Sequence, residues 1–226
     1  MSWSDGYTEN QYARWYTHSI LMDTIKAIKT RYSCRNYSSR KIPKATIRKL
    51  LRLANLAPSG CNLQNRHFLV ITKKEDQQFL SEMNNQPHIA QAPVSIIVLT
   101  HLNHYNTPKN YLKIMESFDM TSWGALSSGY SGNKKFMEEY RKFSKLLIPI
   151  SDATASTSTL LLAANALGIN SCWVGIFDEE QIKERFKIPE KFSVVSVVLL
   201  GYEKEKPKWR AGRKNIKELV HWDTWK

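Results

Sequence analysis

Residues 161–175, LLAANALGINSCWVG, decide the fold because they join a buried helix directly to a buried strand. The first part belongs to a helix predicted over residues 152–167, which is rich in Ala, Ser and Leu and apolar nearly all round, as expected of a core helix. Asp152 lies near the predicted start of this helix, and Gly168 ends it. Residues 171–174 then predict a strand, so the chain passes from helix to sheet at this glycine.

The same alternation of helix and strand continues on both sides of this stretch. Apolar residues at helical spacing predict helices around residues 20–28 and 47–56, and we expect a short polar helix over 74–83 and a further helix over 179–186. Apolar runs predict strands over residues 67–72, 94–100 and 193–200. The strand over residues 94–100 is almost continuously apolar, which suits a central strand covered on both faces. The pattern predicts an α+β sandwich with one sheet between helical layers.

Two regions depart from this regular pattern. Residues 101–150 scatter aromatic side chains among Asn, Ser, Gly and Lys, which is typical of a lid or substrate-binding insert. Their aromatic rings fit two roles equally, stacking on a planar substrate or packing the lid itself. Residues 203–226 form a basic tail with Trp209, Trp222 and Trp225, and three tryptophans predict that the tail packs on its own subunit or on a partner.

Length and composition fit one soluble domain over residues 1–226. The chain has 226 residues, 42% of them hydrophobic, which is enough for one substantial core. We see no uninterrupted apolar segment of membrane-spanning length and no secretory signal, so we expect a cytoplasmic protein without membrane contact. The three cysteines form no CxxC pair and predict reduced thiols, and His101 and His104 lack a third ligand, so we expect no metal site.

The net positive charge suggests nucleic-acid binding as an alternative function. With 33 Lys and Arg against 20 Asp and Glu, the net charge is +13, which attracts anions such as nucleic acid. The basic residues are dispersed, however, and no RNP-like, helix-turn-helix or finger motif accompanies them. A basic nucleic-acid-binding module therefore stays an unfavoured alternative, which predicts steeply salt-dependent binding to DNA or RNA.

The segment RYSCR, residues 31–35, is the first candidate for chemistry. In an extended chain Arg31, Ser33 and Arg35 face one side and could hold one phosphate group through charge-assisted hydrogen bonds. By itself the segment does not differ from an ordinary solvated basic helix end.

Four segments read together give a stronger signal. In order along the chain, they are RYSCRNY at 31–37, APSGCNLQ at 57–64, LLAANALGINSCWVG at 161–175, and LLGY at 199–202 followed by Arg213 and ELV at 218–220. This set resembles the motifs of the nitroreductase family, and the resemblance covers about residues 25–225. It implies a three-layer sandwich with a central mixed, mainly antiparallel sheet flanked by helices, in an intertwined homodimer with an FMN site at each interface.

The resemblance also implies which residues bind FMN. Arg31, Ser33, Arg35 and Arg213 would hold the phosphate, with Arg210 as the nearby substitute for Arg213. The ring edge and ribityl chain would be met by Pro58, Ser59, Asn62 and Gln64 of the other subunit, and the backbone N–H near Gly175 would point at the reactive ring nitrogen. Tyr32 and Val174, beside these positions, complete the expected cofactor contacts.

The implied reaction is a ping-pong transfer of electrons from NADH or NADPH through FMN to an electron-poor acceptor such as a nitroaromatic, quinone or enone. FMN carries the chemistry, so no catalytic side chain is expected. An FMN-dependent oxidase or dehydrogenase of a peptide-like or small metabolite substrate is the alternative within the same fold.

The chain departs from the family pattern at three places. Asn65 and Arg66 replace the usual Pro-Trp, Tyr32 stands where a second basic residue is common, and Ile176 follows Gly175 where a smaller residue is frequent. Ser33 disfavours the flavin-destroying branch of the family, which carries an acidic residue at that position.

Overall fold

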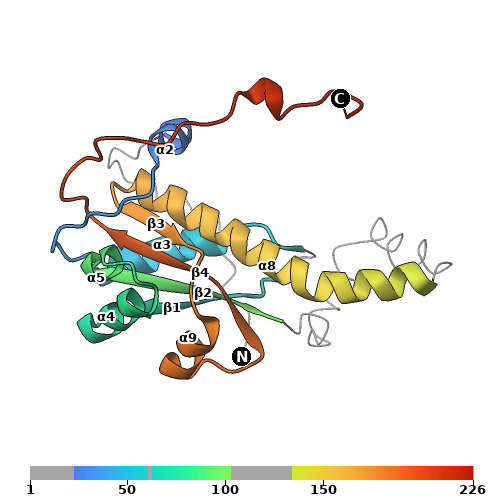
Figure 1. The fold of residues 1–226 in the computed structure, drawn as a ribbon, viewed down its shortest axis with the longest axis horizontal. Coiled ribbons are helices and arrows are strands. Elements are labelled where there is room, and N and C mark those ends of the chain that lie inside the picture. The colour runs from blue at the N-terminus through green and yellow to red at the C-terminus, as the bar shows by residue number, and fades with distance from the viewer. Residues whose placement is uncertain (1–22, 61–62, 103–133, 226) are drawn as a thin grey trace, which may run out of the picture.

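The computed structural model describes residues 23–60, 63–102 and 134–225, of which residues 134–145 are described by their backbone alone. In chain order the elements are α2 (Thr24–Thr30), α3 (Lys44–Asn55), β1 (Arg66–Ile71), α4 (Lys74–Met83), α5 (His88–Gln91), β2 (Val94–His101), α8 (Lys134–Ala166), β3 (Asn170–Val174), α9 (Glu179–Phe186), β4 (Phe192–Gly201) and the short 3-10 helix η2 (Ile216–Glu218). The strands form one sheet in the order β1-β2-β4-β3 (Figure 1).

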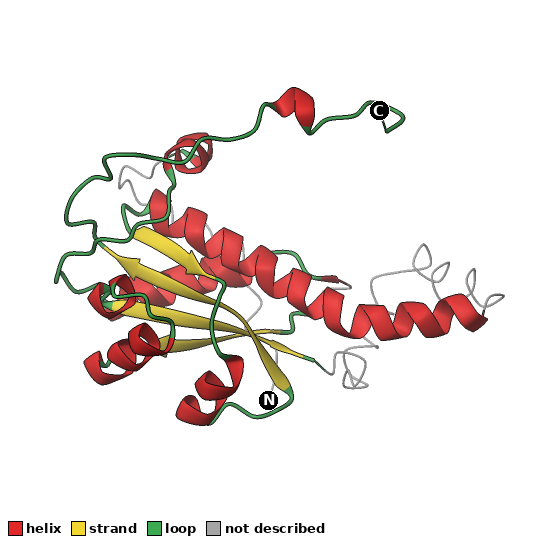
Figure 2. Cartoon of the chain, in the orientation of Figure 1, coloured by secondary structure: helices red, strands yellow, loops and turns green. Residues whose placement is uncertain are grey.

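The sheet lies between two layers of helices (Figure 2). Along β2, Ile96 and Val98 belong to the core cluster shared with α3 and α8, whereas Ile97 and Leu99 belong to the cluster shared with α4, α5 and α9. Successive side chains of a strand point to opposite faces, so a continuously apolar strand supplies both cores. This arrangement confirms the predicted α+β three-layer sandwich.

The strand pairings are almost entirely antiparallel. β1 pairs with β2, β2 with β4, and β3 with β4, each in antiparallel register. Among the described residues, parallel pairing occurs at one isolated bridge, between Ser33 and Ser171. The predicted strands agree with the structure to within one residue at each end, and α4 and α9 have the predicted bounds.

The helix predicted over residues 152–167 is longer than expected. α8 begins at Lys134 and runs through Pro149, so Asp152 lies in its middle and not near its start. A proline inside a helix costs about 3 kcal/mol, but α8 packs along α3 and all four strands, which offsets this cost. Part of the expected lid, residues 134–150, is therefore helical, whereas residues 103–133 lie outside the described residues.

One segment of α8 has the length and composition of a membrane span. It covers Leu146–Ala166, with a mean hydropathy of 1.3. Leu160 and Ala164 of this segment are fully buried in the core cluster of the sheet face. These residues of α8 therefore pack in the protein core.

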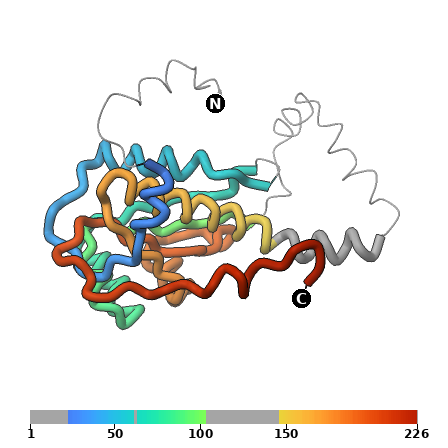
Figure 3. The backbone as a smooth tube through the Cα atoms, turned by 90° about the horizontal axis from the view of Figure 1, so that it is seen from above, coloured from blue at the N-terminus to red at the C-terminus, as the bar shows by residue number. Residues whose placement is uncertain are grey.

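The C-terminal tail does not fold back on its own sheet. It leaves β4 and runs along the outside of the molecule (Figures 1 and 3). Its tryptophans are 77% exposed at Trp209, 80% at Trp222 and 87% at Trp225. The three tryptophans therefore do not pack on their own subunit, which was one of the two predicted alternatives. Packing on a partner stays a prediction.

Candidate functional site

The RYSCR segment is extended and lies beside β3. The side chain of Asp23 caps α2 by accepting a hydrogen bond from the Ile25 N–H at 2.8 Å, and the helix ends at Thr30. Ser33 then bridges Ser171, and the Cys34 N–H donates to the Ser171 carbonyl at 2.9 Å. Because an extended chain alternates its side chains, Cys34 is buried while Arg35 is exposed.

A cavity of about 800 Å³ separates this segment from the start of the C-terminal tail. It is lined by Ile28, Lys29, residues 31–36 and residues 205–213. The cavity therefore brings together five of the residues predicted for the phosphate end of the site: Arg31, Ser33, Arg35, Arg210 and Arg213. Its volume lies in the range of small-molecule sites, about 300–1,000 Å³.

The donor set of this cavity fits the phosphate of FMN. Guanidinium groups bind phosphate oxygens through paired, charge-assisted hydrogen bonds, and a serine hydroxyl adds a further donor. Lys29, Lys206 and Lys208 also line the cavity, against one acidic residue, Glu205. Such an excess of positive charge suits a dianionic group.

Tyr32 anchors the tail to the RYSCR segment. Its hydroxyl donates a hydrogen bond to the Glu203 carboxylate and accepts one from Asn170 Nδ2 at 3.4 Å. The Glu203 N–H in turn donates to Asn170 Oδ1 at 3.1 Å. Burial and the bond to Glu203 raise the pKa of Tyr32 well above its ordinary value, so the hydroxyl stays protonated and can donate.

Arg210 and Arg213 are held differently. The Arg210 guanidinium lies over the Tyr32 ring, 4.2 Å from its centroid, and Nη1 donates to the Thr30 carbonyl at 3.3 Å. Arg213 Nη1 instead donates to the carbonyls of Ala211 and Gly212, at 3.2 and 2.9 Å, within its own tail. In the single chain, Arg210 is thus the tail arginine that contacts the RYSCR segment.

The loop after α3 lies elsewhere. Of its predicted site residues, Pro58, Ser59 and Gln64 do not line the cavity, and Asn62 lies outside the described residues. Ser59 Oγ accepts a hydrogen bond from the Gln64 N–H at 3.1 Å. Gln64 adopts a positive φ of 52°. The structure therefore does not bring these residues to the phosphate end within one chain.

Val174 and Gly175 lie at the end of β3. Val174 is buried in the core, Gly175 is exposed, and neither lines the cavity. A Cβ at Gly175 would come within 3.5 Å of Trp173 Nε1, an ordinary contact, so packing within one chain does not require glycine there.

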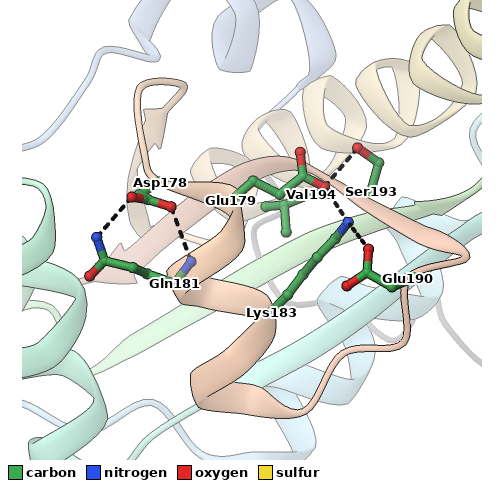
Figure 4. A network of polar contacts seen from close by, with 7 residues as sticks. All are labelled: Asp178, Glu179, Gln181, Lys183, Glu190, Ser193 and Val194. Atoms are coloured by element: carbon green, nitrogen blue, oxygen red, sulfur yellow. Dashed lines mark hydrogen bonds and ion pairs between the residues drawn. The ribbon is translucent and has the colours of Figure 1, made fainter.

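Polar contacts hold the first turns of α9, the short helix that follows β3 (Figure 4). Asp178 caps α9 by accepting from the Gln181 N–H at 3.0 Å. Glu179 Oε1 accepts from Ser193 Oγ at 2.9 Å and the Val194 N–H at 3.0 Å, which ties α9 to β4. Lys183 pairs with Glu179 at 3.2 Å. These contacts hold the start of α9 against β4.

Cys34 and Cys172 are buried in the core. Each is 2% exposed, and burial raises the pKa of both thiols. A protonated, buried thiol is a poor nucleophile, so both residues act as packing groups.

Sequence reasoning missed the residues that act through contacts distant along the chain. Asn170 lies inside the motif at 161–175 and Glu203 directly follows the one at 199–202, but only the fold brings them to Tyr32. At Asp152, an acidic residue in an otherwise apolar helix could have indicated a buried hydrogen-bonding role, but its position predicted the start of the helix. In the structure it accepts a hydrogen bond from the Gly60 N–H.

Comparisons with known proteins agree on one family. The model of the family described as "Nitroreductase family" matches residues 28–202. A relative in Archaeoglobus fulgidus, provisionally named an NADH dehydrogenase/NAD(P)H nitroreductase, is 30% identical over 209 residues, covering 90% of this chain and 99% of its own.

Solved structures have the same fold. A nitroreductase family protein from Clostridium difficile 630 superposes with a TM-score of 0.67 at 27% identity, covering 90% of this chain and 100% of its own. An FMN-dependent nitroreductase from Clostridium difficile R20291 gives a TM-score of 0.63 at 23% identity, covering 89% of this chain and 99% of its own. At 23% identity, the similarity to the second structure shows a shared fold.

Proposed function

The chain belongs to the nitroreductase family, and from this premise we propose that it transfers electrons from NADH or NADPH through FMN to an electron-poor small molecule such as a nitroaromatic, quinone or enone. It is an NAD(P)H-dependent oxidoreductase, and FMN is the cofactor of its family. The observation that carries the proposal is the arginine-lined cavity between residues 31–36 and 205–213.

We assign four residues to the FMN phosphate: Arg31, Ser33, Arg35 and Arg210. Arg213 also lines the cavity. Arg210 is already oriented by the Tyr32 ring and the Thr30 carbonyl. A side chain fixed before the ligand arrives loses less conformational entropy on binding, which favours affinity. The phosphate end is thus built within one chain.

When bound, FMN supplies the redox chemistry, which we propose to be a ping-pong exchange with donor and acceptor using the same face. The chain contributes orientation and electrostatics. We assign Pro58, Ser59, Asn62 and Gln64 to the ring edge and ribityl chain, and the backbone at Val174 and Gly175 to the reactive edge. Amide and hydroxyl groups of this kind match the donors and acceptors of a uracil-like ring.

We further propose that two copies of the chain assemble, so that the loop at Pro58 of one copy meets the ring end of the FMN whose phosphate the other copy holds. Apolar side chains are exposed on α2, at the end of β3 and along the tail, among them Ile28 at 53%, Ile176 at 84% and Trp225 at 87%. Exposed apolar groups in this number are typical of a surface that a partner covers. A second copy would cover them symmetrically.

The experiment is to purify the protein, record its absorption spectrum, identify the released cofactor by mass spectrometry, and follow NADH and NADPH oxidation with and without an acceptor. We expect a yellow protein that releases FMN and oxidises NADH or NADPH when a quinone or nitroaromatic is added. Colourless protein that does not take up added FMN would overturn the proposal. Turnover of a metabolite with oxygen and without NAD(P)H would instead support the oxidase alternative.

A further inference from the structure

Two buried charged side chains, Arg66 and Asp152, hold the chain where α3 ends and the next loop begins. Arg66 is 6% exposed and Asp152 5% exposed, and neither lines the arginine-rich cavity. Charged groups buried to this degree are retained only with polar partners, because their transfer out of water is costly. Their partners therefore indicate what they are there to hold.

Arg66 binds the end of α3 and, within the loop that follows, Pro58. Its Nη2 donates to the Asn55 carbonyl at 2.6 Å, Nε to Asn55 Oδ1 at 3.2 Å, and Nη1 to the Pro58 carbonyl at 3.3 Å. The last carbonyls of a helix have no partner within the helix, so a fork of guanidinium donors suits this position. The side chain that replaces the family's Trp thus fixes the position of Pro58.

Asp152, on α8, binds the same loop at Gly60. Its Oδ1 accepts a hydrogen bond from the Gly60 N–H at 2.8 Å. One helical turn further along α8, Ser156 Oγ donates to the Ala54 carbonyl at 2.8 Å. Residues four apart share a helix face, so one face of α8 bonds both the end of α3 and the loop.

The approach of the loop to α8 requires glycine. A Cβ at Gly60 would come within 2.9 Å of Ile148 Cγ2 on α8, closer than real Cβ contacts. Ser59, the neighbour of Gly60, accepts a hydrogen bond from the Gln64 N–H at 3.1 Å. The placement of Gly60 on α8 therefore sets where Ser59 and Gln64 lie.

We propose that Asp152 and Arg66 are positioning residues for the loop after α3. They act on its backbone at Gly60 and Pro58, and so place Ser59 and Gln64 against the ring end of FMN. The inference rests on the proposed function, in which this loop meets the ring edge and ribityl chain. The two side chains bond the loop backbone at different points, Arg66 at the Pro58 carbonyl and Asp152 at the Gly60 N–H. Neither lines the arginine-rich cavity and both act through the loop backbone, so we do not assign them a catalytic role.

The test compares Asp152→Ala with Asp152→Asn, and uses Ser151→Ala, an exposed neighbour on α8, as the matched control. Dissociation constants for FMN and for riboflavin, which lacks the phosphate, are measured by flavin fluorescence. Because the Gly60 N–H would lose a carboxylate acceptor, the stronger kind of hydrogen-bond partner, we expect Asp152→Ala to weaken both flavins by at least about tenfold and by the same factor. Asp152→Asn keeps an acceptor for the Gly60 N–H and should restore most of the affinity.

Arg35→Ala is the contrasting variant, because it removes a phosphate donor and should weaken FMN far more than riboflavin. Unchanged affinity of Asp152→Ala for both flavins would overturn the inference, as would a loss confined to FMN or a failure of Asp152→Asn to restore binding.

Gly60→Ala decides the matter if Asp152→Ala does not fold. Its added methyl group moves the loop off α8 without altering Asp152, so it should weaken both flavins equally, and unchanged affinity would contradict the inference. The outcome is separable from the proposed function. If the wild-type protein binds neither flavin, the proposed function fails; if it binds and these variants bind equally well, only the positioning role fails.

Discussion

The Arg210 guanidinium lies 4.2 Å from the centroid of the Tyr32 ring, so the C-terminal tail packs on the RYSCR segment of the candidate phosphate site. A cation over an aromatic ring contributes about 0.5–2 kcal/mol, depending on its exposure. Tyr32 stands where a second basic residue is common in the family. Here the tyrosine is not itself charged, but it holds a charged side chain brought from 178 positions further along the chain.

Arg210→Ala should weaken FMN binding more than Arg213→Ala. Arg210 is oriented by Tyr32 and the Thr30 carbonyl, whereas Arg213 bonds the carbonyls of its own tail. Loss of one charge-assisted contact predicts a rise of at least about tenfold in the FMN dissociation constant. Fluorescence titration of both variants measures the difference. A larger effect of Arg213→Ala would show that the tail rearranges when FMN binds.

Tyr32→Phe and Tyr32→Ala separate the two roles of this residue. Phe keeps the ring beneath Arg210 but loses the hydrogen bond to Glu203, whereas Ala loses both. We expect FMN affinity to fall little in Tyr32→Phe and about fivefold or more in Tyr32→Ala, as the cation–π contribution implies. Equal losses in the two variants would mean that the hydroxyl, and not the ring, positions the arginine.

Asp152→Asn should raise the stability of the flavin-free protein at neutral pH. Burial raises the pKa of Asp152, more than the Gly60 N–H and the Arg66 charge lower it. A carboxyl group whose pKa is higher in the folded chain than in the unfolded chain destabilises the fold once it ionises. This penalty is absent below the unfolded pKa, about 3.9, grows as the pH rises towards the folded pKa, and is complete above it.

Urea unfolding of the wild type and Asp152→Asn at several pH values measures this effect. The advantage of the variant should be greatest at neutral pH and should shrink as the pH falls through about 4. An advantage that is independent of pH would show that the charge of Asp152 is not its cause.

Trp222→Ala with Trp225→Ala should weaken assembly of two copies. These side chains are 80% and 87% exposed in the single chain. Buried tryptophans at interfaces often contribute 2 kcal/mol or more each, which corresponds to at least about thirtyfold in the dimer dissociation constant per residue. Light scattering over a dilution series measures it, with exposed Lys217→Ala as the control in the same tail. A wild-type protein that stays monomeric at all concentrations would contradict the proposed assembly.

Much of the fold follows from local pattern in the sequence. The continuous apolar run at residues 94–100 predicted a central strand, and β2 supplies both cores. The start of α8 could not be placed because Pro149 resembles a helix boundary, whereas Phe136, Tyr140, Phe143 and Leu147 already follow helical spacing before it. Tertiary packing overrides the proline, and no local rule records that packing.

The candidate site divides in the same way. The arginines of the RYSCR segment could be found because they lie within one short motif, and the cavity gathers them. The contact of Gly60 with Asp152 joins residues 92 positions apart, so it depends on the three-dimensional fold. The lid over residues 101–150, the cytoplasmic location and the ring-end residues stay predictions, and residues 103–133 and Asn62 lie outside the described part of the chain.

The most direct test of the account is the ratio of the dissociation constants of the wild-type protein for riboflavin and FMN. The two ligands share ring and ribityl chain and differ only in the phosphate. If Arg31, Arg35 and Arg210 hold that phosphate, two or more charge-assisted contacts predict that FMN binds at least about a hundredfold more tightly. Equal affinities for the two ligands would contradict the assignment of this cavity as the phosphate end of a flavin site.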